Sequence, residues 1–514
     1  MNPLPGSYPI LRCDEARTLE TKVLGSDEAR EWSALQRAGR AIAAAILQDG
    51  GEIGGLPEDG RLLVLAGKGH NGGDALIAAQ ALLARLPAAK ADVLFVFGLA
   101  ELRPLADRAW RQLASAWPGR VRVIPRLIPG TPYTLSLDGI FGFQFRSPAE
   151  ARVIELIASA NALPVRVRAA VDLPSAGLFR ADFTYATGSV KTPVVGAPEA
   201  GRVRFLDLGF FEVPPGAEAA VWPQADRVLT REVLAPLAAL RPSQSDKRTY
   251  GHVFIVGGSR GYPGAVLLTV IAALRSGVGL VTAFVPESLV PAFAARAPEA
   301  MWVGWPETPT GHLALEGEYL LRERVSRATA LVVGPGLGRE PETLALARSL
   351  VAQSAVPLVI DADALQPDVV SAGTAPRIVT PHAGEYARIQ AALAERPDVI
   401  VVRKGPVTRI DGGSGPRTSQ REGEPTAAER APTYHSFFGG PVLARGGSGD
   451  LLAGLTGGLL AQTPAEPLLA AARGLVWHGA AADRLARAQG QVAVRTIEVA
   501  DYLSAALGAS VDDR

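Results

Sequence analysis

Residues 446–461 read GGSGDLLAGLTGGLLA, and this stretch carries the strongest structural signal in the chain. Four small residues precede Asp450, and the apolar run behind the carboxylate predicts a helix that begins directly after it. Free N–H groups and the helix dipole make the start of a helix a site for anions. A carboxylate in such a site is costly unless it has a task, such as accepting the proton of a hydroxyl group that attacks phosphate. The alternative is that Asp450 only caps the helix.

Short apolar runs, alternating with helical segments, extend outward from this stretch over the whole chain. In the second half they are HVFIVGG (252–258), ALVVGPGLG (330–338), PLVIDADAL (357–365), RIVTPHAGE (377–385) and DVIVVRKG (398–405). In the first half they are RLLVLAG (61–67), ADVLFVFG (91–98), YTLSLDG (133–139), RVRAAVDLPS (166–175) and GRVRFLDLG (201–209). Because most of the runs are continuous rather than alternating, they predict strands covered on both faces, which is typical of parallel sheets. Helices are expected over 14–47 and 75–86.

A Pro-rich, polar segment over 212–245 separates the two series and predicts a domain boundary. We expect one domain over residues 1–225 and a second over 226–514, both of the α/β class. Residues 411–430 are rich in Ser, Gly, Pro and charge, which predicts an exposed loop.

The composition excludes several classes of protein. The chain has 514 residues, with 52 Lys and Arg against 51 Asp and Glu, whereas general binding to nucleic acid or membrane surfaces needs a basic excess. The single cysteine, Cys13, excludes an intrachain disulfide and a Cys-based zinc site. The N-terminus lacks a signal-peptide pattern, and no apolar run reaches about 18 residues. We therefore expect a cytoplasmic protein that binds neither nucleic acid nor membranes.

The second half carries an ordered series of motifs around the glycine-rich stretch. They are IVGGS (255–259), YPGA (262–265), SGVGLV (276–281), GPGLG (334–338), DADAL (361–365), TPHAGE (380–385), KG (404–405), GGSGD (446–450) and WHG (477–479). In this order they resemble the ribokinase-like, nucleotide-dependent NAD(P)H-hydrate dehydratases. The resemblance implies a ribokinase-like α/β domain that uses ADP or ATP with Mg²⁺, which neutralises phosphate charge.

The resemblance also implies roles for individual residues, with Asp450 as the general base. The hydrated nicotinamide is expected near Ala265, Gly336, Gly338, His382 and Asp450. The nucleotide is expected along Lys404, Gly405, Pro406, Val407 and Thr408 and along Gly446, Gly447, Ser448 and Gly449. In that family the nucleotide phosphorylates the C6 hydroxyl of the hydrate, and loss of phosphate restores NADH or NADPH. The family's Asn-Pro-Gly-Met-Ala pattern before the turn is GGPVLA (439–444) here.

Two alternatives concern this second half. No GxxxxGK[ST] motif occurs, so the glycine turn must hold the phosphates. A ribokinase-like kinase for a vitamin alcohol is the competing function, although related kinases usually carry Asn at the position of His382. His382 itself could be a polar residue at a strand end that makes a single hydrogen bond. Asp361 and Asp363 follow a strand near the expected phosphates, where caps or turns are as common as ligands.

In the first half, GKGHNG (67–72) formally matches the G-x-G-x-x-G pattern of dinucleotide-binding dehydrogenases. The next predicted strand does not end in the acidic residue that would hold a ribose, and Asp74 at the expected helix start would repel a pyrophosphate. A second interpretation gathers the oxygens of Asn71, Asp74, Asp138, Asp172 and Ser175 at the carboxyl ends of parallel strands. Without Lys or Arg between them, such oxygens invite a cation. The alternative is that each aspartate caps its own helix.

Residues 10–210 resemble NAD(P)H-hydrate epimerase domains through QRAG (36–39), GKGHNGGD (67–74), LDGIFG (137–142) and VDLPS (171–175). The resemblance implies a Rossmann-like three-layer domain. It assigns potassium to Asn71, Asp138 and Ser175, and substrate to His70, Asn71, Gly72, Gly73, Asp74, Gly142 and Asp172. Asp172 is the expected proton-handling group, with Lys191 as its companion.

The epimerase pattern is altered in three places. The chain has His70 and Ala75 at the ends of the Asn-Asn-Gly-Gly-Asp-Gly motif, GFQF (142–145) in place of Gly-Thr-Gly-Leu, and an inserted Ala176. Because glycine permits close approach to a ligand, Phe143 and Gln144 could obstruct the substrate turn. The first domain is therefore either an epimerase or a binding or scaffold module that has lost catalysis. Together the two resemblances imply a fused repair enzyme for NADH and NADPH hydrates, expected as a homo-oligomer.

Overall fold

The structure is a computed structural model that describes residues 3–25, 27–146, 148–212, 222, 226–412 and 431–508. The chain divides into two compact units. The N-terminal unit comprises mainly residues 8–225 with 486–493, and the C-terminal unit comprises residues 226–485 with 1–7 and 494–513. The loop expected over 411–430 lies outside the described residues, except for Asp411 and Gly412 at the end of a strand.

The N-terminal unit has a parallel sheet of seven strands in the order β4-β3-β2-β5-β6-β7-β9. Its strands are β1 (Ser7–Leu11), β2 (Arg61–Ala66), β3 (Lys90–Phe95), β4 (Val121–Val123), β5 (Tyr133–Gly139), β6 (Val165–Val171), β7 (Phe183–Thr187), β8 (Val190–Lys191) and β9 (Arg202–Leu206). Its helices are α1 (Cys13–Leu24), α2 (Glu28–Gly50), α3 (His70–Arg85), α4 (Pro104–Ala116) and α5 (Ala151–Asn161). The short strand β8 pairs with β1 outside the seven-stranded sheet.

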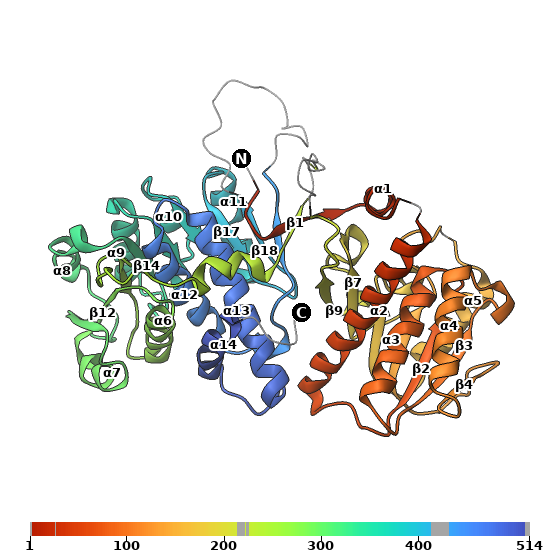
Figure 1. Ribbon diagram of the computed structural model, residues 1–514. Helices are drawn as coiled ribbons and strands as arrows, with labels where there is room; N and C mark the ends of the chain where they lie inside the picture. Colours follow the sequence, from red (N-terminus) through yellow and green to blue (C-terminus); the bar gives the residue numbers. More distant parts are fainter. Residues whose placement is uncertain are drawn as a thin grey trace. The chain divides into compact units, whose positions relative to one another are not determined.

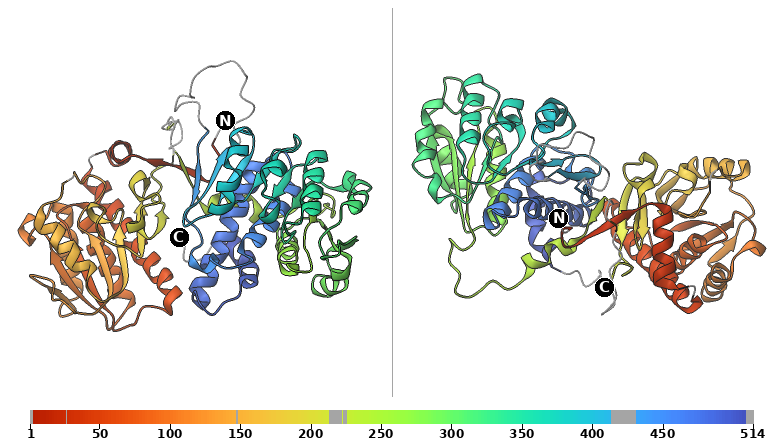
Figure 2. Two further views of the ribbon diagram at one scale, coloured as in Figure 1. Left: turned by 180° about the vertical axis from the view of Figure 1, so that it is seen from behind. Right: turned by 90° about the horizontal axis from the view of Figure 1, so that it is seen from above.

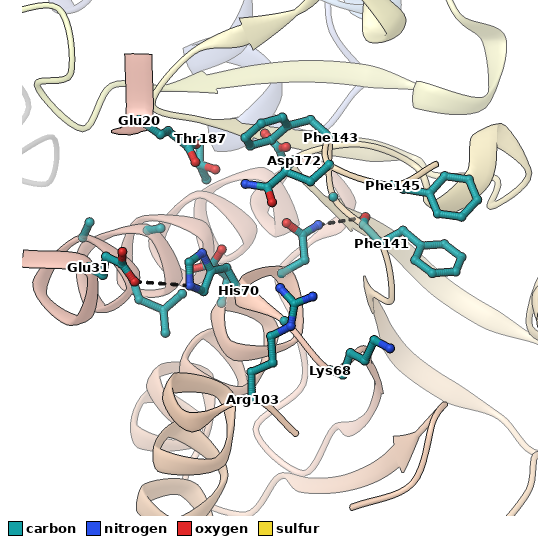
Figure 3. A pocket seen from close by; sticks show the side chains of 18 of the residues that line it. Glu20, Glu31, Lys68, His70, Arg103, Phe141, Phe143, Phe145, Asp172 and Thr187 are labelled. Carbon is teal, nitrogen blue, oxygen red and sulfur yellow. Dashed lines mark hydrogen bonds and ion pairs between the residues drawn. The ribbon is translucent and has the colours of Figure 1, made fainter. Parts of the chain in front are cut away.

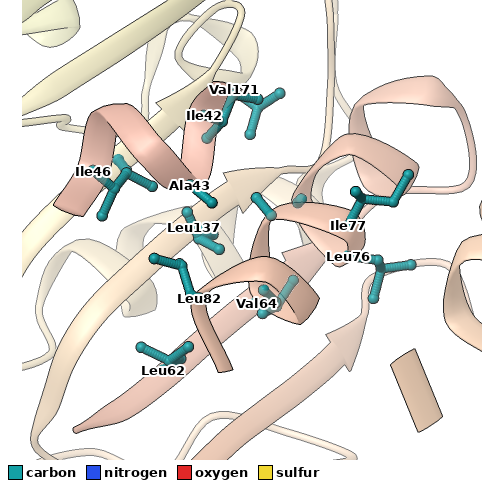
Figure 4. Packing of buried hydrophobic residues seen from close by; sticks show 14 of the residues in the cluster. Ile42, Ala43, Ile46, Leu62, Val64, Leu76, Ile77, Leu82, Leu137 and Val171 are labelled. Carbon is teal, nitrogen blue, oxygen red and sulfur yellow. The ribbon is translucent and has the colours of Figure 1, made fainter. Parts of the chain in front are cut away.

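Alternation along the buried strands supplies two cores on opposite faces of this sheet. Leu62 and Val64 of β2 pack with residues of α2 and α3, whereas Leu63 and Leu65 pack with residues of α5. The first of these cores is seen in Figure 4, and the neighbouring helices α2, α3 and α4 in Figure 1. Since successive side chains of a strand point to opposite faces, a continuous apolar run must be covered on both sides. The predicted three-layer, Rossmann-like arrangement is confirmed.

The helical stretch expected over 14–47 consists of two helices. Helix α1 ends at Gly25, which adopts a left-handed conformation with φ +65°. Helix α2 then starts after Asp27, whose carboxylate accepts hydrogen bonds from the N–H groups of Ala29 and Arg30. A left-handed glycine followed by an aspartate cap ends one helix and begins another.

The C-terminal unit has a mostly parallel sheet in the order β13-β12-β11-β14-β15-β16-β17-β18-β19-β10. Its strands are β10 (Arg227–Leu229), β11 (His252–Val256), β12 (Leu280–Pro286), β13 (Met301–Trp305), β14 (Ala330–Val333), β15 (Leu358–Ile360), β16 (Arg377–Val379), β17 (Ile400–Arg403), β18 (Thr408–Gly412) and β19 (Tyr434–Ser436). Its helices are α6 (Pro263–Arg275), α7 (Val290–Arg296), α8 (Glu318–Arg322), α9 (Pro341–Gln353), α10 (Pro367–Val370), α11 (Ala383–Ala394), α12 (Ser448–Gln462), α13 (Pro467–Gln489) and α14 (Leu503–Leu507).

Helices cover this second sheet on both faces, so the predicted α/β class is confirmed here as well (Figure 2). On one face, alternate residues of β11 and β14 pack with helix α9. On the other face lies α12, where a Cβ on Gly457 would come within 2.3 Å of the Val332 side chain. The sheet departs from a purely parallel one at β18, which runs antiparallel to both β17 and β19. In the described part of the chain, no helix combines the length and apolar character needed to span a membrane.

Candidate active sites

The glycine-rich turn of the C-terminal unit leads into α12, which begins at Ser448 rather than after Asp450. Gly447 is the residue before the helix and has φ +90°, a conformation that favours glycine. A Cβ at this position would lie 2.6 Å from the Leu268 side chain. Asp450 is the third residue of the helix and does not cap it, so the capping alternative is wrong. Its carboxylate lies in the first turn, where the helix dipole favours negative charge.

Lys404 and the carboxylates of Asp361 and Glu385 lie beside this first turn. The Nζ atom of Lys404 donates a hydrogen bond to Oδ1 of Asp361 at 3.0 Å and lies 4.0 Å from Oε2 of Glu385. A Cβ on Gly449 would be 3.0 Å from the same Nζ atom, so the lysine reaches the start of α12. Asp361 follows β15, Glu385 lies in α11 and Lys404 follows β17, so the carboxyl ends of neighbouring parallel strands bring the group together.

The charges of this group set the protonation of Asp450. Burial raises the pKa of Asp450 to about 6, the charges of Asp361, Asp363 and Glu385 add to the increase, and Lys404 opposes it. Although burial disfavours the charge of Lys404, Asp361 and Glu385 raise the pKa of the lysine. At neutral pH the site therefore presents a charged lysine beside a carboxylate that is ionised and able to accept a proton.

The residues expected to contact the hydrated nicotinamide lie near this group. A Cβ on Gly336 would be 3.0 Å from the Cβ of Ala265, so these two residues are neighbours. The N–H of Gly338 donates to Oδ2 of Asp363 at 3.1 Å. His382 caps α11: its Nδ1 accepts hydrogen bonds from the N–H groups of Gly384 and Glu385. The imidazole is mostly exposed, and its Nε2 atom lies 3.4 Å from Oε1 of Glu385.

The five residues from Lys404 to Thr408 form the turn between β17 and β18. The hydroxyl of Thr408 donates to the carbonyl of Gly405 at 3.3 Å. The N–H of Lys404 donates to the carbonyl of Pro381 at 2.9 Å, which ties this turn to the end of β16. On the other side, the hydroxyl of Thr496 donates to the carbonyl of Gly446. The Lys404 side chain thus connects the turn at 404–408 with the glycine turn and with Asp450.

The N-terminal unit contains a cavity of about 220 Å³ at the carboxyl ends of its strands (Figure 3). Of the residues expected to bind substrate, His70, Asn71, Asp74, Gly142 and Asp172 line the cavity. Gly72 and Gly73 do not line it. A Cβ on Gly72 would meet the carbonyl of Gly67 at 2.1 Å, and one on Gly73 would meet Leu35 at 3.0 Å, so both glycines serve helix packing.

A buried ion pair joins Asp172 to Lys191. The Nζ atom of Lys191 lies 2.5 Å from Oδ1 of Asp172 and also donates to the carbonyl of Thr187 at 2.8 Å. Both side chains are almost fully buried, and Asp172 adopts φ +65°, a conformation that costs energy for a residue other than glycine. Oδ2 of Asp172 has no hydrogen-bond partner among the described residues. A strained residue with a free acceptor atom beside a cavity is typical of a functional site.

Asp138, Ser175 and Asn71 form a second group of polar residues, connected through Phe141. Ser175 donates to Asp138 through its hydroxyl at 2.6 Å and through its N–H at 2.8 Å. The amide nitrogen of Asn71 donates to the carbonyls of Phe141 and Val171. Asp138 is fully buried and forms no ion pair with a described residue, and burial raises its pKa to about 6. A buried carboxylate among hydroxyl, amide and carbonyl oxygens fits a cation that prefers oxygen ligands.

Comparison with known proteins agrees with both sites. A family model described as NAD(P)H-hydrate dehydratase matches residues 253–505, and one described as YjeF-related protein N-terminus matches residues 33–197. The bifunctional NAD(P)H-hydrate repair enzyme Nnr of Gloeobacter violaceus is 35% identical over 88% of this chain and 89% of its own. Its counterpart from Moorella thermoacetica is 33% identical over 86% of each chain. The chain belongs to the family of bifunctional NAD(P)H-hydrate repair enzymes.

One solved structure completes the comparison. An ADP/ATP-dependent NAD(P)H-hydrate dehydratase from Bacillus subtilis, co-crystallized with ATP and Mg²⁺, matches with 26% identity and a TM-score of 0.43. The match covers 54% of this chain and 96% of that one. Both resemblances noted in the sequence are confirmed at the level of the family, in the predicted N-to-C order.

Two expectations about the repair-enzyme family's epimerase half need correction. Asp74 is not at a helix start, because α3 begins at His70, and its carboxylate caps nothing. Asp172 is not free of basic neighbours, because Lys191 neutralises it. The altered turn forms part of the cavity wall, since Phe143 and Gln144 line it, and the centre of the Phe143 ring lies 5.0 Å from Nζ of Lys191. Gly142 remains essential to the turn, because a Cβ there would be 2.4 Å from Oδ1 of Asn71.

The sequence did not point to several residues of the repair-enzyme sites. In the sequence, Asp361 is as readily a cap or turn residue as a ligand, although it is the partner of Lys404 in the structure. Glu385 appears in the sequence only as part of the TPHAGE motif. In the epimerase half, Glu20, Lys68 and Arg103 line the cavity. Neither Lys68 nor Arg103 forms an ion pair with a described side chain, so both are available to an anion. Two basic residues around the glycine-rich loop are the signal that could have indicated them.

Proposed function

We propose that this chain dehydrates the S epimer of NADH and NADPH hydrates in its C-terminal unit and interconverts the R and S epimers in its N-terminal unit. The observation that carries the proposal is Asp450 in the first turn of α12, with its pKa raised to about 6 by burial and with Lys404 beside it. This arrangement supplies a base at neutral pH and a positive charge for phosphate in one place.

For the dehydration, Asp450 accepts the proton of the C6 hydroxyl as that oxygen attacks the terminal phosphate of the nucleotide. The bond between this phosphate and the rest of the nucleotide breaks, so AMP leaves when ADP is the donor and ADP leaves when ATP is the donor. Lys404, held by Asp361 and Glu385, stabilises negative charge on the phosphate oxygens. Free N–H groups at the start of α12 also stabilise the negative charge on the phosphate oxygens. Phosphate then leaves C6 with the help of the electron pair on the ring nitrogen, and loss of a proton from C5 restores the dihydronicotinamide.

Magnesium is proposed to enter with ADP or ATP. In the described part of the chain, no group of three or more His, Cys, Asp or Glu side chains is arranged to hold a metal ion by itself. The phosphates would therefore supply several of the ligands, and Asp361 or Asp450 lies near enough to the helix start to contribute. When bound, the ion would neutralise charge on the phosphates.

For the epimerisation, Asp172 is the residue that handles a proton, and Lys191 is its ion-pair partner. Lys68 and Arg103 at the cavity fit the diphosphate of the dinucleotide. Asn71, Asp138 and Ser175 would hold potassium, which would neutralise the buried carboxylate of Asp138 and fix the loop that carries Asp172. Phe143 of the altered turn lines the cavity, and the centre of its ring lies 5.0 Å from Nζ of Lys191. The assay of epimerisation therefore decides between an active epimerase and a decayed binding module.

The direct test uses purified protein with (6S)-NADPH hydrate, Mg²⁺ and either ADP or ATP, and measures the recovery of the dihydronicotinamide absorbance. Recovery that depends on the nucleotide supports the dehydratase, and the faster nucleotide identifies the phosphate donor. A stable phosphorylated product without recovered absorbance would instead support a kinase. Cytoplasmic location and homo-oligomeric assembly remain predictions, the second of which light scattering measures directly.

A further inference from the structure

Glu20, Asp74 and Asp172 line the cavity in the N-terminal unit, and Lys191 pairs with Asp172. Glu20 and Asp172 are labelled in Figure 3. Glu20 comes from α1, Asp74 from α3, Asp172 from the end of β6, and Lys191 from β8. Among the described residues, Lys191 is the basic group whose charge acts on both Glu20 and Asp74. Lys191 neutralises one carboxylate of this group, Asp172. Glu20 and Asp74 are then left without a lysine of their own in the part of the chain that the structure describes.

The contacts of these carboxylates differ. Lys191 is committed to Asp172 at 2.5 Å. Asp74 is only 7% exposed, and its Oδ1 atom has no partner among the described residues. Burial raises the pKa of Asp74 well above its ordinary value, and the charges of Asp172 and Glu20 add to this effect. Asp74 is therefore a buried carboxyl group in the wall of the cavity, and its charged form is disfavoured there.

The proposed epimerisation makes a demand that one carboxylate does not meet. The hydroxyl must leave one face of C6 and water must add to the opposite face, so the reaction needs a proton donor and a proton acceptor. Asp172, whose Oδ2 atom has no partner among the described residues and whose Oδ1 atom is paired with Lys191, is suited to be the acceptor. A second group that can hold a proton must face the same space.

Glu20 is the cavity residue that meets this demand. His70 and Glu31 also line the cavity, but they lie 3.7 Å apart and can pair with one another. Glu20 lines the cavity without an ion pair or hydrogen bond to a described side chain. Burial raises its pKa to about 7, Asp172 and Glu31 add to the increase, and Lys191 opposes it. Glu20 can therefore carry a proton near neutral pH.

We propose that Glu20 is a second catalytic residue of the epimerase, which exchanges a proton with the C6 hydroxyl while Asp172 serves the opposite face of the ring. The proposal rests on the epimerase function proposed above.

The reaction balances with these two carboxylates alone. Protonated Glu20 gives its proton to the C6 hydroxyl, and the C–O bond breaks so that water leaves with the bonding electrons. The electron pair of the ring nitrogen forms the N1–C6 double bond. Water adds to the other face of C6, the double-bond electrons return to nitrogen, and the proton of the water goes to Asp172. The reverse epimerisation starts from this final protonation state.

The test measures the interconversion of a single epimer of NADPH hydrate by chromatography, with the full-length chain and without nucleotide so that dehydration does not occur. We expect Glu20→Gln to lower the rate at least 100-fold. Glu28→Gln, an exposed glutamate at the start of α2, is the matched control and should stay within twofold of the wild type. Both variants should keep the unfolding temperature and the nucleotide-dependent dehydration of the S hydrate.

A pH profile separates a catalytic role from a structural one. The groups around Glu20 are Asp74, Asp172, Glu31 and Lys191. Because the pair Glu20 and Asp172 works with one shared proton, the wild-type rate should fall as the pH rises past about 7. Glu20→Asp should retain part of the rate and this decline, whereas the residual rate of Glu20→Gln should lack the decline.

The possible contradictions are distinguishable. A wild-type chain that does not accelerate epimerisation would overturn the epimerase function and this inference together. A normal rate in Glu20→Gln would overturn the inference and leave the epimerase standing. A slow Glu20→Gln variant that keeps the wild-type pH profile would also overturn it, because Glu20 would then only position other groups.

Discussion

Asp450 is the proposed general base of the dehydration in the C-terminal unit. We expect Asp450→Asn to reduce dehydration about 10²- to 10⁴-fold, since general bases contribute in this range. Nucleotide binding should be retained, because Lys404 and the start of α12 are unchanged. Steady-state rates and nucleotide titration of the variant measure both effects, and a variant with the wild-type rate would remove Asp450 from the mechanism.

The same substitution should stabilise the fold. The pKa of Asp450 is about 6 in the folded chain and near 3.8 when unfolded, so the folded state binds more protons between these values and loses stability as the pH rises through them. At pH 7 this costs about 1–3 kcal/mol, which Asn avoids. Thermal unfolding should therefore show a more stable Asp450→Asn variant at pH 7 and no gain at pH 4.

The rate of dehydration should depend on pH through the same group. A base must be ionised to accept a proton, and the pKa of Asp450 is about 6 in the free protein. We expect kcat/KM to fall about tenfold for each pH unit below 6 and to level off above pH 7. A flat profile between pH 5 and 7 would show that proton transfer to Asp450 does not limit the reaction.

At the residue scale, the sequence predicted the site residues that lie in local motifs. It did not predict the residue pairs that form only through tertiary contacts. Asp450 and Asp172 follow recognisable glycine-rich or strand-end patterns. The pairing of Lys404 with Asp361 joins residues 43 positions apart in the chain, at the ends of β15 and β17, which lie on either side of β16 in the sheet. Glu20 lies in an ordinary helical pattern, so no local signal distinguishes it.

At the scale of elements, the glycine turn before α12 should tolerate substitution unequally. Ala at Gly447 must adopt φ +90° and place its Cβ 2.6 Å from Leu268, which strains the helix start. Gly446→Ala is the matched comparison, since no atom lies within 4 Å of its Cβ position. We expect Gly447→Ala to lower stability by about 1–3 kcal/mol and Gly446→Ala to change it by less than about 0.5 kcal/mol, measured by denaturant unfolding.

The turn at 142–145 offers a second test of element geometry. Gly142→Ala would place a Cβ 2.4 Å from Oδ1 of Asn71 and displace the amide that joins Phe141 to Val171. Epimerisation should fall at least tenfold, while dehydration of the S hydrate stays within twofold because that site lies in the other unit. Equal loss of both activities would indicate general unfolding instead.

The elements themselves were predictable to different degrees. Continuous apolar runs indicated the buried strands, because burial on both faces leaves a strong local pattern. Helix boundaries failed where a single backbone conformation decides them, as at Gly25 between α1 and α2 and at Gly447 before α12. Strands β18 and β19 are short, and their antiparallel pairing depends on contacts between segments far apart in sequence.

At the scale of the whole molecule, the ordered motifs identified the family in both halves. They covered most of the chain because the residues of each site recur at the ends of successive parallel strands. The boundary between residues 225 and 226 remains a proposal, and the compact N-terminal unit also includes residues 486–493. Because those eight residues come from the far end of the sequence, a simple cut at the boundary would separate this unit from part of itself.

The measurement that tests the bifunctional assignment most directly uses a mixture of R and S NADPH hydrates with Mg²⁺, K⁺ and the preferred nucleotide. Recovery of NADPH absorbance should be rapid and complete in the wild type, faster than spontaneous epimerisation allows. Asp172→Asn should show a burst limited to the S fraction, and Asp450→Asn almost no recovery. A wild-type chain that stops at the S fraction would contradict the epimerase function, and one with no nucleotide-dependent recovery would contradict the dehydratase.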